Sequence, residues 1–204
     1  QFGLTRQCVS VDDVAAAYDA VAATYDAAVA GDEWIRQRLW QHYRRVFRPG
    51  SRVIDLSCGT GIDATFLAER GIHVVGLDAS AGMIAECRRK VAERGLGDLV
   101  ESRQADLTVL ASLAPSSFDG ALSAFGGLNT VADLGRLSGD LARALRPESH
   151  VVAHFVNRFS VWEAIGYLAR GKFSSIWQLS RRDKRAFPIG GRSIRHYVYG
   201  PSET

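Results

Sequence analysis

Two glycines and a carboxylate form the clearest chemical pattern in the sequence. Gly59 and Gly61 separate a short apolar run, 53–56, from a segment at 62–70 that is rich in helix-forming residues. A glycine turn between a buried strand and a helix N-terminus lets a ligand approach the backbone amides, because glycine has no Cβ. Asp78 follows Gly61 by 78 − 61 = 17 residues and ends the next apolar run, where a carboxylate can accept both hydroxyl protons of a ribose. These residues predict a site for a nucleoside-containing cofactor.

The elements that must position this turn alternate along the chain. Short apolar runs bounded by Gly, Pro and Asp predict strands, and amphipathic runs between them predict helices. Such alternation implies right-handed crossovers and a parallel, doubly wound, Rossmann-like α/β sheet, expected in the order 3-2-1-4-5. The strands are expected at 53–56, 73–78, 98–104, 118–124 and 150–156, and the helices at 11–29, 33–47, 62–70, 81–94 and from Thr130 or Asp133 to Leu145.

The run Asp55-Leu56-Ser57-Cys58-Gly59-Thr60-Gly61 resembles the first motif of the class I S-adenosylmethionine-dependent methyltransferases, an acid after a hydrophobic strand and then a glycine-rich turn that ends CGTG. One residue departs from the motif, since Ser57 stands where the family usually has its first glycine. A wider turn, or a hydroxyl contact to the cofactor, would accommodate it. The resemblance implies S-adenosylmethionine as cofactor and S-adenosylhomocysteine (SAH) as its product.

The same resemblance implies further cofactor contacts. Asp106, after the third strand, would meet the adenine amino group, and the loop after the fourth strand would lie beside the sulfonium. Tyr25, within Ala-x-x-Tyr-Asp, would lie near the methionine end, although a ring that fills a helix face explains it equally well. The expected cofactor-binding residues are Tyr25, Asp55, Ser57, Cys58, Gly59, Gly61, Asp78, Ala79, Met83, Ala105, Asp106, Leu107, Ala124, Phe125 and Gly126.

The chain is expected to form one domain with three parts. Residues 1–48 would be an N-terminal helical flap over the cofactor site, and 49–156 the cofactor-binding core. Residues 157–204 would form a helical lid or substrate element and the start of a C-terminal region that is cut short at Thr204. The family adds an antiparallel pair after strand five, of which the sequence suggests only one strand, Ser193–Tyr199.

Composition sets broad limits on function. The 204 residues are 47% hydrophobic and 23% charged, which is ordinary for a folded domain. No apolar run approaches a membrane span and no signal peptide opens the chain, so a cytoplasmic protein without a membrane partner is expected. Cys8, Cys58 and Cys87 show no paired spacing, and no Cys/His pattern has zinc-ligand form, so no metal is expected.

The expected activity is methyl transfer to an O, N or C atom of a small molecule. The loop Ala124-Phe125-Gly126-Gly127 lacks the Asn/Asp-Pro-Pro-aromatic form of nucleic-acid amino-methyltransferases, so a nucleic-acid partner is disfavoured. In-line displacement requires alignment and desolvation, and no universal catalytic residue. Candidates for a titrating group are His154, Tyr18 and His196, although a packing role is favoured for each. The oligomeric state is left open.

Two other function classes stay open. Gly59-Thr60-Gly61-Ile62-Asp63-Ala64 also fits the G-x-G-x-x-A fingerprint, so an NAD(P)-binding oxidoreductase is one alternative. Against it stand Asp55 inside the first strand, the third strand-end acid Asp106, and the lack of a Tyr-x-x-x-Lys pair. The other alternative is a non-catalytic cofactor-binding sensor or assembly protein.

Overall fold

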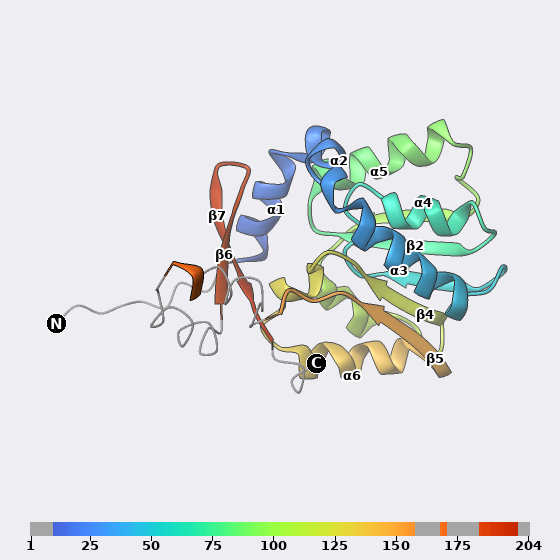
Figure 1. The fold of residues 1–204 in the computed structure, drawn as a ribbon. Coiled ribbons are helices and arrows are strands. Elements are labelled where there is room, and N and C mark those ends of the chain that lie inside the picture. The colour runs from blue at the N-terminus through green and yellow to red at the C-terminus, as the bar shows by residue number, and fades with distance from the viewer. Residues whose placement is uncertain (1–9, 158–167, 171–183, 200–204) are drawn as a thin grey trace.

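The computed structural model describes residues 10–157, 168–170 and 184–199. Its centre is a parallel sheet with strand order β3-β2-β1-β4-β5 (Figure 1). Each neighbouring pair in this sheet is parallel. The predicted doubly wound, Rossmann-like sheet and its strand order are therefore confirmed. The strands are β1 (Arg52–Asp55), β2 (His73–Asp78), β3 (Val100–Gln104), β4 (Phe118–Ser123) and β5 (Leu145–Ala153).

Helices cover both faces of the sheet (Figure 1). Leu39, Tyr43, Leu67 and Val91 belong to the core cluster on the face covered by α3, α4 and α5. The other face packs against α6 and a 3₁₀ turn at 107–112. The central strands β1, β2 and β4 are mainly buried and apolar, as expected for a parallel sheet covered on both faces, whereas the outer strands β3 and β5 are more polar and more exposed. The helices are α3 (Glu33–Val46), α4 (Ile62–Ala68), α5 (Ala81–Glu93) and α6 (Leu134–Ala144).

The N-terminal helix predicted at 11–29 is broken in the structure. It consists of α1 (Val11–Asp19), a 3₁₀ turn at Ala22–Thr24, α2 (Tyr25–Ala28) and a second 3₁₀ turn at Ala30–Asp32. At the break, Asp19 Oδ1 accepts hydrogen bonds from Ser80 Oγ (2.6 Å) and from Gly82 N (2.8 Å) at the start of α5. These tertiary contacts outweigh the helix propensity of the alanine-rich segment.

The fifth strand begins earlier than predicted. Leu145 was expected to end a helix, with Arg146-Pro147 separating it from a strand at 150–156, but β5 begins at Leu145. Phe118 pairs with Leu145 and Gly120 with His150, so the ladder contains an irregularity. β5 has three more residues than β4 between these two pairs and is an edge strand, which explains why the proline is tolerated within it.

The chain ends in a separate antiparallel hairpin of β6 (Lys184–Ile189) and β7 (Arg192–Tyr197). The strand predicted at 193–199 is confirmed as β7. Lys184–Pro188 was assigned to a helical segment, and this was wrong. Gly190 and Gly191, with φ of +56° and +74°, form the two-residue turn between the strands. Most of the predicted lid, residues 158–167 and 171–183, lies outside the described residues.

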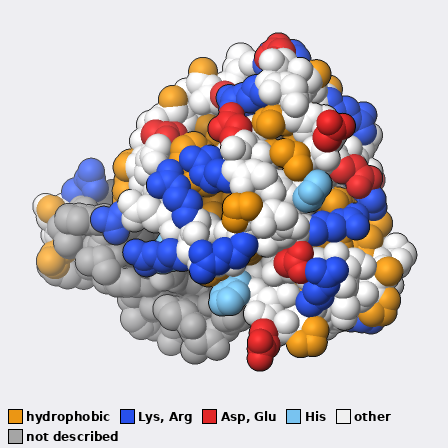
Figure 2. All heavy atoms as spheres, turned by 90° about the vertical axis from the view of Figure 1, so that its right-hand side faces the viewer, with side chains coloured by type: hydrophobic (Ala, Val, Ile, Leu, Met, Phe, Trp, Pro, Cys, Tyr) orange, Lys and Arg blue, Asp and Glu red, His pale blue; other side chains and the backbone are white. Residues whose placement is uncertain are grey.

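Surface features complete the picture of the described part of the chain. None of its helices combines the length and the apolar character needed to cross a bilayer. The cytoplasmic location stays a prediction. Figure 2 shows basic side chains in a broken band across one face, with acidic side chains above and below it. On α5 and just after it, Arg88, Arg89 and Arg94 each have a hydrogen-bonded partner.

Candidate functional site

Backbone geometry explains both glycines of the turn after β1. Gly59 and Gly61 have φ of +53° and +79°, in the left-handed region that residues with a Cβ disfavour. At Gly61 a Cβ would also lie 2.4 Å from the Sγ of Cys87 on α5. The Gly59 N–H donates to Oδ2 of Asp78 at 2.9 Å. The carboxylate at the end of β2 thus fixes the turn at the end of β1.

A cavity of about 380 Å³ opens at the carboxyl ends of β1, β2 and β4. Small-ligand sites typically have roughly 300–1,000 Å³. The wall contains Ser57 of the turn, Asp78 of β2 and Phe125 after β4, and the N-terminal segment adds Tyr18 and Tyr25. This is the switch point between β1 and β4, where ligands bind in open α/β sheets.

Asp78 has unused hydrogen-bonding capacity towards the cavity. Its Oδ1 accepts from Ser80 N and its Oδ2 from Gly59 N, both at 2.9 Å. Each carboxylate oxygen has two lone pairs, so one acceptor position remains on each. Burial raises the pKa of Asp78, and the two backbone hydrogen bonds oppose that rise. The group can hold a pair of adjacent hydroxyls.

Asp106 has a structural role as well as a place in the cavity wall. Its Oδ1 accepts from the Thr108 N–H at 2.8 Å and from the Thr108 hydroxyl, which begins the 3₁₀ turn after β3. Ala105 and Leu107 lie on either side of it along the chain and also line the cavity. A flat apolar group would fit between these small and branched side chains.

The structure brings most of the predicted cofactor residues together. Eleven of the fifteen line the same cavity, and they come from six separate segments of the chain. These eleven are Tyr25, Ser57, Gly59, Asp78, Ala79, Met83, Ala105, Asp106, Leu107, Ala124 and Phe125.

The other four predicted cofactor residues are not part of the cavity wall. Asp55 is buried below the turn, where its Oδ1 accepts from Ser57 N at 3.3 Å, and burial together with nearby Asp63 raises its pKa well above the usual range. A hydrogen bond with Cys87 and burial raise the pKa of Cys58. Gly126, with φ of +76°, shapes the loop after β4. These residues and Gly61 determine the shape of the wall from behind it.

Of the three candidate titrating groups, only Tyr18 lines the cavity. Burial raises its pKa well above the ordinary value, so its phenol is a hydrogen-bond donor at neutral pH. Burial lowers the pKa of His154 and of His196, so both imidazoles stay neutral. The His154 ring packs 5.7 Å from Phe125, and His196 packs 5.0 Å from Phe187.

Several wall residues were not among the predicted cofactor-binding residues. Four of them, Gly127, Thr130, Val131 and Ala132, follow directly from the loop after β4, and extending that loop by a few residues would have found them. The residues from α1 and β7 could not be found this way, because no local pattern says where those elements pack. The additional wall residues are Ser10, Val11, Val14, Tyr18, Leu56, Thr108, Gly127, Thr130, Val131, Ala132 and Tyr197.

Ser57, the departure from the glycine-rich motif, is accommodated by a glycine across the cavity floor. The hydroxyl oxygens of Ser57 and Ser123 are 2.8 Å apart, which joins the turn to the end of β4. A Cβ on Gly127 would lie 1.7 Å from Ser57 Oγ. The two positions are therefore complementary in size.

The wall has little charge. Among the described residues that line it, only Asp78 and Asp106 have ionisable carboxylates, and none is a Lys, Arg or His. The described part of the chain contains no group of three or more His, Cys, Asp or Glu that could hold a metal ion. The site is suited to an organic ligand with hydroxyl groups and a flat apolar ring.

Comparison with known proteins agrees with this geometry. Residues 53–148 match the family model of a methyltransferase domain. A demethylmenaquinone methyltransferase from Symbiobacterium thermophilum is 31% identical over 140 residues, which cover 67% of this chain and 53% of that protein. A ubiquinone biosynthesis O-methyltransferase from Hahella chejuensis is 32% identical over 114 residues, 56% of this chain and 47% of that protein. The chain spans about half the length of these curated relatives.

A solved structure extends the likeness to the fold. The DhpI–SAH complex is 25% identical, covers 95% of this chain and 82% of its own, and has a TM-score of 0.66. The family match includes the glycine turn, Asp78, Asp106 and Phe125, which surround the cavity. By this domain, the chain belongs to the class I S-adenosylmethionine-dependent methyltransferases.

Proposed function

We propose that this protein transfers a methyl group from S-adenosylmethionine to an O, N or C nucleophile of a small molecule. The observation that carries the proposal is that Asp78, the glycine turn and the Phe125 loop surround one cavity at the carboxyl edge of the sheet. The cofactor supplies an electrophilic methyl group on a sulfonium. The protein then has to align the two reactants and exclude water, which the mainly apolar wall supports.

The wall fits the cofactor part by part. The free acceptor positions of Asp78 suit the two ribose hydroxyls, and the apolar surface around Ala105 and Leu107 suits the adenine ring. We assign Asp106, which lines the same part of the wall, to the adenine amino group. Ser57 and the other turn residues remain for the methionyl end, together with Tyr25 and Phe125.

We assign indirect roles to the predicted residues outside the wall. Asp55, Cys58, Gly61 and Gly126 hold the turn and the β4 loop in shape. Tyr18 is the one candidate titrating residue in the wall, and its neutral phenol would donate a hydrogen bond to the acceptor or the cofactor rather than remove a proton.

The three predicted parts of the chain keep their assigned functions in this proposal. Residues 1–48 act as the flap, because α1 and α2 supply Tyr18 and Tyr25 to the wall. Residues 49–156 form the cofactor-binding core. Residues 157–204 contribute to the acceptor site, and Tyr197 of β7 in the wall supports this.

The acceptor is expected to be an uncharged molecule with an apolar ring. The described wall around the cofactor region has no cation to pair with a carboxylate or phosphate, and its outer part contains Val11, Val14 and Val131. The relatives named above act on demethylmenaquinone and in ubiquinone biosynthesis. A phenol or quinol is therefore the first acceptor class to test.

Isothermal titration with SAH and, separately, with NADH tests the cofactor. We expect SAH alone to bind, since the alternatives of an NAD(P)-binding oxidoreductase and of a non-catalytic sensor are not favoured by the methyltransferase relatives. A tritiated-methyl screen over phenols, quinols, amines and carboxylic acids should then identify an acceptor. Binding of NADH alone would overturn the proposal. SAH binding without any transfer would favour the sensor.

Asp78→Ala is expected to weaken SAH binding by about 1–3 kcal/mol, roughly 5- to 150-fold. The substitution removes the ribose acceptor and also the hydrogen bond that fixes the Gly59 amide. Titration calorimetry measures the change. Asp98→Ala is the matched control, because this exposed carboxylate precedes β3 at the opposite edge of the sheet. An unchanged dissociation constant for Asp78→Ala would show that the ribose lies elsewhere.

A further inference from the structure

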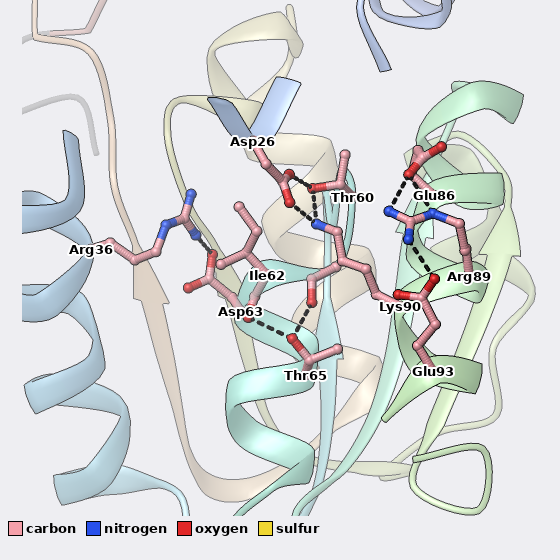
Figure 3. A network of polar contacts seen from close by, with 11 residues as sticks. Asp26, Arg36, Thr60, Ile62, Asp63, Thr65, Glu86, Arg89, Lys90 and Glu93 are labelled. Carbon is pink, nitrogen blue, oxygen red and sulfur yellow. Dashed lines mark hydrogen bonds and ion pairs between the residues drawn. The ribbon is translucent and has the colours of Figure 1, made fainter. Parts of the chain in front are cut away.

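Asp26 of α2 joins the N-terminal segment to the glycine turn and to α5 (Figure 3). The Thr60 hydroxyl donates to Asp26 Oδ1 at 2.5 Å and accepts from Lys90 Nζ at 2.9 Å. Lys90 Nζ also forms an ion pair with Asp26 Oδ2. Three polar groups from three separate segments therefore satisfy one another.

Burial makes this contact stronger than an ordinary surface ion pair. Thr60 is 1% exposed and Lys90 8% exposed, whereas the Asp26 carboxylate reaches solvent on one side. A largely buried ammonium that loses its anion is left with an uncompensated charge. Burial alone would raise the pKa of Asp26, but the hydrogen bonds from Lys90 and Thr60 outweigh it and hold that pKa below its ordinary value. Asp26 is charged at neutral pH.

The helix that carries Asp26 has little stability of its own. α2 is four residues long, lies between two 3₁₀ turns, and receives no side-chain cap from Thr24. Helices this short do not persist in water without tertiary contacts. Tyr25 is next to Asp26, lines the cavity, and packs edge-on against Tyr18 with ring centroids 6.2 Å apart. The position of the Tyr25 ring therefore depends on what anchors α2.

We propose that Asp26, Thr60 and Lys90 form a clamp that positions Tyr25 against the bound cofactor and so sets how long SAH remains bound. This inference rests on the proposed function. Thr60 lies between the two glycines of the cofactor turn, so the clamp connects the flap to the part of the site that contacts the ligand. Asp19, at the end of α1, is hydrogen-bonded to Ser80 and Gly82 and is a second contact between the flap and α5.

The test measures the dissociation rate of SAH by stopped-flow competition. Asp26→Ala should accelerate dissociation about tenfold, the size expected for loss of a charge-assisted hydrogen bond. Thr60→Val should accelerate dissociation to a similar extent. Thr60→Ser keeps the hydroxyl and should therefore keep the wild-type dissociation rate. Arg89→Gln is the matched control, because it breaks the exposed ion pairs of the adjacent residue on α5 and should leave the rate unchanged (Figure 3).

Hydrogen exchange without cofactor separates the clamp from the proposed function. The Val29 amide, which donates to Tyr25 O at 3.0 Å, should exchange about tenfold faster in Asp26→Ala than in wild type. Faster exchange in Asp26→Ala, combined with a wild-type protein that binds no SAH, would support the anchoring of α2 by the clamp and refute the cofactor assignment. Wild-type SAH binding with unchanged dissociation and exchange in both Asp26→Ala and Thr60→Val would overturn the clamp alone.

Discussion

Asp63→Ala is expected to lower the free energy of unfolding by about 3–5 kcal/mol, the usual loss when one partner of a buried ion pair is removed. Asp63 of α4 pairs with Arg36 of α3, and both residues are 5% exposed. Its Oδ1 also accepts from the Trp40 indole N–H at 2.7 Å. The substitution leaves a buried guanidinium without its anion (Figure 3) and a partly buried indole without an acceptor, so the two helices lose their polar connection.

Asp63→Ala should also disturb the wall of the cavity. The Arg36 guanidinium lies 4.3 Å from the ring centroid of Phe125, which lines the wall. Without Asp63, the Arg36 side chain would turn towards solvent, and the Phe125 ring would lose its contact with the guanidinium. We therefore expect SAH to bind less tightly to the variant even at temperatures where it remains folded.

Urea unfolding gives the stability change, and a second site on the same helix supplies the control. Glu69→Ala breaks an exposed ion pair with Arg94 just after α4 and should cost less than about 1 kcal/mol. A double substitution, Arg36→Met with Asp63→Leu, removes both charges together and should be milder than Asp63→Ala alone. A loss below about 1 kcal/mol for Asp63→Ala would mean that the pair is solvated in solution.

The sheet could be predicted because its signals are local. Each central strand is a short, mainly apolar run, and each crossover helix begins at a recognisable residue, such as Ser80, whose hydroxyl accepts from Met83 N at 3.0 Å. Strand ends at one edge follow from the topology alone, which is why Asp78 and Asp106 could be assigned to a common site. Most of the eleven predicted residues in that site follow the strand ends for this reason, while Tyr25 lies on α2 and Met83 on α5.

The misassigned segments depend on distant contacts. Nothing near Ala20 stops a helix, and the break there follows from hydrogen bonds of Asp19 to α5. Arg146-Pro147 suggested the end of a helix after Leu145, but pairing with β4 extends β5 through these residues. The hairpin did have a local signal, because Gly190-Gly191 is a typical two-residue turn, and its charged flanks concealed it.

The wall residues from α1 and β7 belong to a third class. Val14 and Tyr197 are far apart in the sequence and close the same cavity. Their side chains are ordinary for an amphipathic helix and a strand, so residue type gives no indication of a site. Only the packing of the flap and the hairpin places them there, and a single sequence does not specify that packing.

Gly127→Ala is expected to destabilise the fold by about 1–3 kcal/mol or more, the range for overpacked sites, and to weaken SAH binding at least about tenfold. The new methyl group would lie 1.7 Å from Ser57 Oγ and 2.5 Å from its Cβ, so the turn or the β4 loop has to move. Both segments line the cavity. Urea unfolding and titration with SAH measure the two effects.

Ser57→Gly should rescue Gly127→Ala, because it removes the two atoms that clash and restores the residue usual in this motif. The single variant Ser57→Gly loses the hydrogen bond to Ser123 and should cost only about 0.5–1.5 kcal/mol.

Gly139→Ala, in an exposed part of α6 with nothing within 4 Å of the new Cβ, is the control and should be neutral or slightly stabilising. The double variant would then be more stable than Gly127→Ala alone, which is a coupling that independent sites do not show. If the stability losses of the two single variants simply add up in the double variant, positions 57 and 127 do not depend on each other in size. The effect of Ser57 would then be confined to the turn.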